Sequence, residues 1–203
     1  MPRLLPAAAA KIKNKMKKIK ILLKMGFFLC LPLFILPFCY ACNSGTTGNA
    51  TLSSLQGEVL VKKAGDFDWI KGQLNMALKA GDAIKSATEA NAIVTFFDGS
   101  TIELKADTQI EITELIKKQP KEIRLKQEIG ETISRVKKLV DPASIYEIET
   151  LSAVIGVRGS SMLVNVAPDG TTVVQNLEGQ ISITSLGIEV KIPEGGTGSV
   201  TPG

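Results

Sequence analysis

Between Tyr146 and Ile183, apolar and polar residues alternate in three runs, which are broken where glycine, proline or an Asp-Gly pair occurs. Alternation with a period of two is typical of a strand with one buried face, whereas a helix repeats its apolar positions every three or four residues. Glycine, proline and Asp-Gly between such runs indicate tight turns. This segment therefore predicts short strands joined by turns, and it restricts the chain to a fold that contains a β-sheet.

The same pattern continues back to Thr51, so we predict one all-β domain over residues 51–203. We expect a single elongated domain of two sheets, sandwich-like or solenoid-like, built from antiparallel hairpins. Asp98-Gly99 and Asp169-Gly170 each predict a hairpin. At Asp98-Gly99 we expect a two-residue turn in which both residues have positive φ. Further strands are expected at residues 57–61, 69–70, 92–97, 100–104, 110–112 and 188–192, with a Gly-Asp turn at 81–82.

An ordered series of short motifs resembles the FecR domain, an extracytoplasmic all-β module of bacterial iron-signalling sensors. The series includes a T-x-x-A-x-x-x-V-R-G-T-like run at residues 150–160, a D-G-T tip at 169–171 and an L-E-G-x-V-x-V-like run at 177–183. Two residues depart from the pattern: Ser160 replaces the usual Thr, and Met162 replaces a frequent aromatic. Earlier positions that fit are Gly57, Val59, Trp69, Leu78, Gly81, Asp82, Ile84, Ala92, Phe96, Asp98, Gly99 and Ser100, so the resemblance covers about residues 54–202.

Residues 121–140 fit two local structures. Ile123, Leu125 and Ile129 share strand parity, whereas the set Ile129, Ile133, Val136 and Val140 has helical spacing. Gly130 would weaken a helix by roughly 1 kcal/mol relative to alanine. The resemblance to the FecR domain favours two strands around Gly130.

The N-terminal segment predicts an export signal. Residues 1–24 hold eight Lys or Arg and no acid, residues 25–41 are uncharged, and Cys42 follows Ala41. A basic stretch, an apolar stretch and a small residue before the cut are typical of a signal peptide. We assign residues 1–41 to that signal, with the true start at Met1 or Met16.

The Ala41-Cys42 junction resembles a bacterial lipoprotein cleavage site, although Cys39 and Tyr40 depart from its usual residues. We therefore expect Cys42 to be lipidated and residues 42–50 to be a flexible tether, with a root-mean-square span of roughly 15 Å. Two alternatives stay open: cleavage by an ordinary signal peptidase nearby, and an uncleaved membrane anchor. The anchor is disfavoured because residues 25–41 contain two prolines and fall short of the roughly 20 apolar residues of a spanning helix.

Charge and cysteine content exclude several classes of function. The chain has a net charge of +4, but residues 1–42 hold eight basic residues and no acid, so the remainder carries 16 basic and 20 acidic residues. A net charge of −4 without a basic stripe argues against a nucleic-acid partner. Cys30, Cys39 and Cys42 are the only cysteines and the chain has no histidine, which removes disulfide scaffolds, the usual zinc sites and histidine-based catalysis.

Few residues suggest chemistry, so we predict no enzyme, no cofactor and no metal. Ser134 and Lys137 match S-x-x-K, but the partner motifs of a penicillin-binding site are absent and the match is interpreted as chance. Arg158 has two interpretations: a contact with an anion or carboxylate of a partner, or a structural hydrogen bond to carbonyls or a carboxylate within the fold. The lysine-rich runs at 117–121 and 137–138 are interpreted as solvated strand ends rather than as a lipid-binding patch.

Two classes of function fit these observations. The first is a lipid-anchored extracytoplasmic module for protein interaction or envelope signalling, whose partner is an unidentified envelope protein. FecR-type sensors also have a cytoplasmic part that acts on a sigma factor, and the predicted export signal leaves no place for it here. The second is a structural envelope protein that binds peptidoglycan or polysaccharide, so that its partner is a cell-wall polymer. The residues do not distinguish between these two classes.

Overall fold

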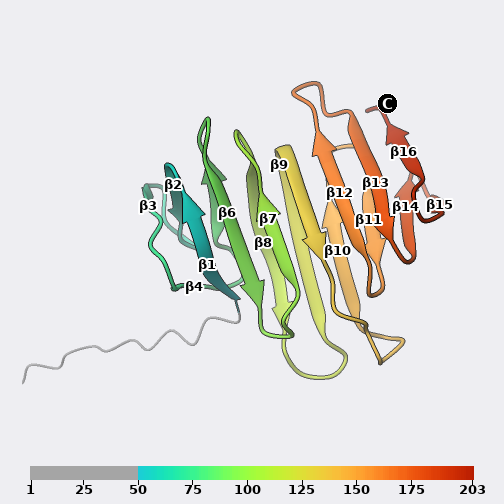
Figure 1. The fold of residues 1–203 in the computed structure, drawn as a ribbon, viewed down its shortest axis with the longest axis horizontal. Helices are drawn as coiled ribbons and strands as arrows, with labels where there is room; N and C mark the ends of the chain where they lie inside the picture. Colours follow the sequence, from blue (N-terminus) through green and yellow to red (C-terminus); the bar gives the residue numbers. More distant parts are fainter. Residues whose placement is uncertain (1–49) are drawn as a thin grey trace, which may run out of the picture. The chain divides into compact units, whose positions relative to one another are not determined.

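We analysed a computed structural model, which describes residues 50–203. These residues form sixteen strands and no helix, as the alternation predicts (Figure 1). The strands are β1 (Ala50–Gln56), β2 (Val59–Lys62), β3 (Trp69–Lys71), β4 (Met76–Leu78), β5 (Ala83–Ser86), β6 (Asn91–Phe96), β7 (Thr101–Leu104), β8 (Gln109–Ile116), β9 (Glu122–Arg135), β10 (Ile145–Glu149), β11 (Val154–Val157), β12 (Ser161–Val166), β13 (Thr172–Glu178), β14 (Ile181–Ser185), β15 (Ile188–Ile192) and β16 (Thr197–Val200).

The strands are arranged in two layers, which we call sheet A and sheet B; sheet A lies in front in Figure 1. Sheet A has the order β4-β1-β6-β7-β9-β12-β13-β16. Sheet B has the order β3-β2-β5-β8-β9-β10-β11-β14-β15. Only β9 belongs to both sheets, so it connects the two layers without closing them into a barrel.

Strand β9 changes sheet at Gly130. Its first half pairs with β8 and β10 in sheet B, and its second half pairs with β7 and β12 in sheet A. Gly130 has φ of 90°, and the corner is tied by Gln127, whose side-chain amide donates to the Gly130 carbonyl and accepts from Thr132. The prediction of strands on both sides of Gly130 is confirmed, and the two halves run on as one strand.

Antiparallel pairing dominates, with one exception. Strand β10 runs parallel to the first half of β9, with Ile145 opposite Glu122. A parallel neighbour cannot be reached by a tight hairpin, so the chain crosses from sheet A to sheet B through residues 136–144. Every other strand pair in residues 50–203 is antiparallel, in line with the predicted antiparallel hairpins.

The hairpin after β6 forms where Asp98-Gly99 predicts it, but its turn is longer than expected. Residues 97–100 connect β6 to β7, and only Gly99 of the Asp98-Gly99 pair has positive φ. The Phe96 N–H donates to the Ser100 carbonyl, and the Phe96 carbonyl accepts the Gly99 N–H. This is the pattern of a turn followed by a glycine bulge. The expected two-residue turn, with positive φ at both Asp98 and Gly99, is therefore wrong. In the turn that forms, the Asp98 carboxylate accepts the backbone N–H and the hydroxyl of Ser100.

The hairpin between β12 and β13 repeats this geometry at Asp169-Gly170. Gly170 has positive φ, and its N–H donates to the Ala167 carbonyl. The Thr171 N–H donates to the Asp169 carboxylate at 2.9 Å, and this bond lowers the pKa of that exposed carboxyl. The same kind of turn thus recurs at both predicted positions.

The core fills the space between the two sheets. Along β6 and β12 every second side chain is buried, as an alternating strand with one inward face requires. Phe96 of sheet A meets Tyr146 of sheet B edge to face, with ring centroids 6.1 Å apart. Residues 46–203 form one compact unit, and the buried side chains run through it as a single cluster. This unit therefore has its own hydrophobic core, the property that lets a domain fold independently.

Tyr146 gives a test of this core by titration. Its hydroxyl is buried with Ser134 Oγ at 3.1 Å, and burial raises the pKa of the phenol far above its usual value near 10. The unfolded chain releases this proton more easily, so stability is expected to fall as the pH rises above about 10. Tyr146 is the only tyrosine in residues 46–203, so phenolate absorbance should appear only with unfolding. Phenolate absorbance from a folded domain near pH 10 would contradict this placement.

Candidate functional site

A groove of about 550 Å³ lies on the outer face of sheet B. It lies over four neighbouring strands, β10, β11, β14 and β15. We call it the outer groove. The residues that line it and face outward include Ile145, Glu147, Gly156, Arg158, Ser182, Glu189 and Lys191.

One row of residues in register explains the hollow. Glu147 pairs with Gly156, Gly156 with Ser182, and Ser182 with Lys191. Residues opposite each other on neighbouring strands share one face of a sheet. Because the two central positions carry the smallest side chains of the row, they form the floor, and the charged residues at its ends form the walls.

The charged residue of one wall forms an ion pair, and those of the other wall, within the part of the chain that the structure describes, do not. Glu147 forms an ion pair with Arg124, which also lies 3.1 Å from Glu114 Oε2 and 3.3 Å from Glu122 Oε2. Within residues 50–203, Lys191 has no ion-pair partner within 4 Å, and neither has Glu189 beside it on β15. The wall formed by β15 therefore offers one free charge of each sign to a ligand in the groove.

Arg158, the residue with two interpretations, lies directly after β11 at one end of the outer groove. Its guanidinium is exposed and donates a hydrogen bond to the Pro142 carbonyl in the crossover segment. This contact is of the kind expected if Arg158 has a structural role, a hydrogen bond to a carbonyl within the fold. Arg158 also lines the outer groove, and its contact with a partner stays a prediction.

Strand β15 is the edge of sheet B next to the outer groove, and its apolar residues are exposed. It pairs with β14 alone, through a two-residue turn at Leu186-Gly187 in which both residues have positive φ. Ile188 is 68% exposed, Val190 52% and Leu186 94%. The alternation of IEVKI predicts this strand but gives no sign of its edge position, because strand order depends on pairing partners far away in the sequence.

The S-x-x-K residues do not form a catalytic pair. Ser134 lies in β9 rather than on a helix, and its hydroxyl is buried against Tyr146. Lys137 is exposed beyond the end of the strand, and its backbone N–H donates to Ser100 Oγ. In the part of the chain that the structure describes, no group of three or more Asp, Glu, His or Cys side chains is arranged to hold a metal ion.

The predicted signal peptide at residues 1–41, the lipidation of Cys42 and the tether lie outside the described residues, except that Ala50 begins β1. Over residues 50–203, no helix has the length and apolar character needed to span a bilayer.

Comparisons with known proteins relate this fold to one family. Two crystal structures of a "putative anti-sigma factor" from Parabacteroides distasonis are similar, each with a TM-score of 0.49, 18% identity and coverage of 59% of both chains. The chain thus spans about three fifths of the length of those structures, and no curated protein matches it. The family model described as FecR protein matches residues 82–182, which run from the Gly81-Asp82 turn to the floor of the outer groove. The chain therefore belongs to the FecR family.

Proposed function

We propose that this protein is an extracytoplasmic signalling module, anchored to a membrane through a lipid on Cys42, that binds another envelope protein along β15. Membership of the FecR family supports a signalling or regulatory role. The basic and apolar leader that ends at Ala41-Cys42 supports export and lipidation. The module acts by binding, without catalysis.

The observation that carries this proposal is the exposed apolar edge of β15. A sheet edge presents unpaired backbone N–H and C=O groups, and an extended partner segment can add to it as another strand. Of the four edge strands, β3 and β4 have three residues each and β16 has four, whereas β15 has five. Strand β15 is therefore the longest edge available for strand addition.

The side chains of β15 supply contacts beyond the backbone. Ile188 and Val190 are exposed on one side of the strand, while Glu189 and Lys191 line the outer groove on the other. An added strand could cover the first pair, and a side chain of the partner could enter the groove between the free charges. Backbone pairing provides affinity and these side-chain contacts provide selectivity.

Crosslinking in cells tests this proposal. A photoreactive residue in place of Val190, in the full-length chain, is expected to capture a defined protein partner. The double variant Ile188→Lys/Val190→Lys should weaken capture by roughly tenfold or more, because lysine on an edge strand opposes strand addition. Both positions are exposed, so stability should change by less than about 0.5 kcal/mol each.

Ile70→Lys is the matched control, because Ile70 is an exposed apolar residue on β3, the opposite edge of the same sheet. Equal capture by the wild type and the β15 double variant would exclude this edge as the contact. Sedimentation of the folded domain with cell-wall sacculi, without any protein partner, would instead support the polymer-binding class.

A further inference from the structure

Two lysine-bearing segments, separated in sequence by strand β9, meet at one end of the sandwich. One is the loop at 117–121 between β8 and β9, and the other is the crossover segment at 136–144. The Lys121 N–H donates to Ser144 Oγ at 3.0 Å, and the Ile145 N–H donates to the Lys121 carbonyl at 2.8 Å. We call this surface the lysine end; its cations are Lys117, Lys118, Lys121, Lys137 and Lys138.

The lysine end has an excess of positive charge. Four of its lysines are exposed and Lys121 is half-buried. No ion pair within 4 Å involves any of the five, as far as residues 50–203 show. Asp98 and Asp141 lie at the same end, where they accept hydrogen bonds from Ser100 and Ala143, and their two charges offset only part of the charge of the five lysines.

An apolar side chain is exposed beside three of these lysines, Lys121, Lys137 and Lys138. Val140 follows Lys138 and Leu139 in the crossover segment and is 93% exposed. Peripheral proteins enter a bilayer surface with an exposed apolar group beside basic residues: the cations meet anionic headgroups and the apolar group enters the acyl boundary.

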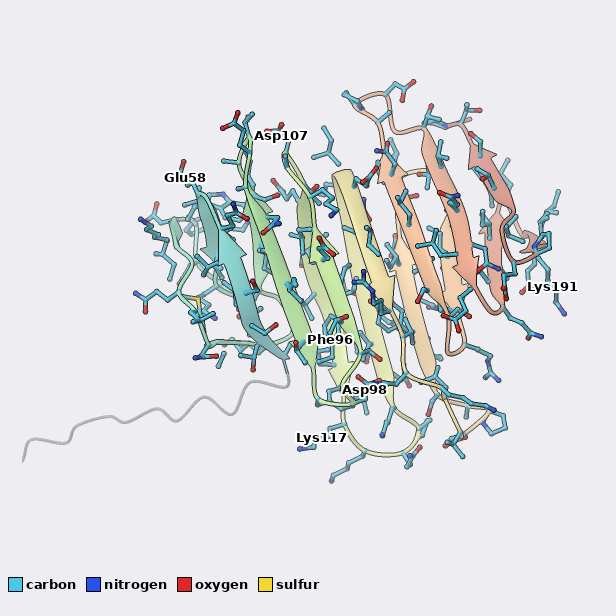
Figure 2. The ribbon with its side chains drawn as sticks, viewed as in Figure 1. Glu58, Phe96, Asp98, Asp107, Lys117 and Lys191 are labelled. Carbon is cyan, nitrogen blue, oxygen red and sulfur yellow. The ribbon has the colours of Figure 1, made fainter. Side chains whose placement is uncertain are left out.

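The described chain also begins at this end. Ala50 lies opposite Phe96 in register, and Phe96 leads into the turn whose Ser100 hydroxyl accepts the Lys137 N–H. Figure 2 shows Phe96, Asp98 and Lys117 at one end of the strands and Glu58 and Asp107 at the other. The loops at that opposite end carry acidic residues, including Glu58, Glu89, Asp107 and Asp169.

We propose that the lysine end is a docking surface for an anionic phospholipid bilayer, into whose headgroup region Val140 inserts. This rests on the proposed lipid anchor, because eight residue steps from Cys42 to Ala50 reach at most about 25–30 Å. The lysines are thus kept close to the membrane, and only within about a Debye length, roughly 8–10 Å, do they feel its charge. Docking would turn the acidic loops away from the membrane and leave β15 accessible at the side of the sandwich.

Vesicle binding tests this surface without the anchor. Residues 46–203, a compact unit without Cys42, are mixed with phosphatidylcholine vesicles that contain or lack about one third phosphatidylglycerol. We expect salt-sensitive binding to the anionic vesicles alone. The triple variant Lys117→Gln/Lys118→Gln/Lys138→Gln should weaken this binding by about tenfold or more, because each lysine near an anionic surface contributes to attraction.

The matched control is Lys71→Gln/Lys85→Gln/Lys126→Gln, which removes the same charge from exposed lysines on β3, β5 and β9. It should bind almost as the unmutated domain does. Equal loss in the two triple variants would overturn the proposal, because attraction would then follow net charge rather than this surface. No binding of the folded domain to anionic vesicles would overturn it as well.

Insertion of Val140 is tested separately. Residues 46–203 contain no cysteine, so Val140→Cys carries one polarity-sensitive dye. Its emission should shift to the blue on anionic vesicles, whereas a dye at Leu186→Cys, an equally exposed position at the β14–β15 turn, should not shift. Equal behaviour of the two dyes would contradict insertion. Fractionation of cells that express the full-length Cys42→Ser chain tests the anchor, so a failure of the anchor and a failure of the lysine end are distinguishable.

Discussion

Replacing Gly130 by alanine is expected to destabilise residues 46–203 by about 3–5 kcal/mol, which is a large part of the 5–15 kcal/mol stability of an ordinary domain. Gly130 has φ of 90°, where a side chain is strained. A Cβ atom there would also lie 2.5 Å from the Thr108 Cα atom and 2.7 Å from the Asp107 carbonyl oxygen. Both atoms belong to the backbone, so the clash cannot be relieved by a rotamer change. Urea unfolding followed by circular dichroism measures the loss.

Gly187→Ala separates the two causes. Gly187 has φ of 78°, but a Cβ atom there would meet nothing within 4 Å. Its alanine variant has the backbone strain without the clash and should lose about 1 kcal/mol. The difference between the two variants measures the close contact at the corner of β9. Equal losses of stability would mean that a Cβ atom at position 130 costs nothing beyond the backbone strain.

The corner also explains why apolar periodicity predicts only the first half of β9 as a strand. Inward positions of β9 are Ile123, Leu125 and Gln127 before the corner and Thr132 and Ser134 after it, so the parity changes at Gly130. After the corner the buried residues are polar, and Ile133 faces outward. Apolar periodicity therefore identified the first half as a strand and left the second half with an apparent helical spacing.

The placement of strands followed from local patterns, whereas the surfaces that matter for binding did not. IEVKI predicts β15 with its observed bounds, Ile188–Ile192, because alternation is a property of neighbouring residues. Its position at an edge depends on the strands that pair with β14, which lie elsewhere in the chain. From the sequence alone, each lysine run, at 117–121 and at 137–138, is typical of a solvated strand end. They meet because β9 leaves one end of sheet B and returns to the same end through sheet A.

The Gly81-Asp82 turn has a structural role that a Gly-Asp pair in the sequence does not predict. Asp82 is fully buried and its carboxylate accepts three hydrogen bonds: from Lys63 Nζ at 2.7 Å, the Ala64 N–H at 2.9 Å and the Lys79 N–H at 3.1 Å. One buried carboxylate thus joins the segment after β2 to the segment between β4 and β5. A buried charge of this kind is tolerated because its hydrogen bonds replace those of water.

Replacing Asp82 by alanine should therefore destabilise the domain by about 3–5 kcal/mol, since two backbone donors and the Lys63 ammonium lose their partner together. Asp82→Asn should lose less, because the amide oxygen still accepts one or two of the three bonds. Urea unfolding of residues 46–203 measures both variants. Glu103→Gln is the control: Glu103 also pairs with a lysine, Lys105, but near the surface, and its removal should cost less than about 1 kcal/mol. If Asp82→Ala costs no more than this control, the carboxylate does not hold the two segments together, and the buried turn must be maintained by the packing of the neighbouring strands alone.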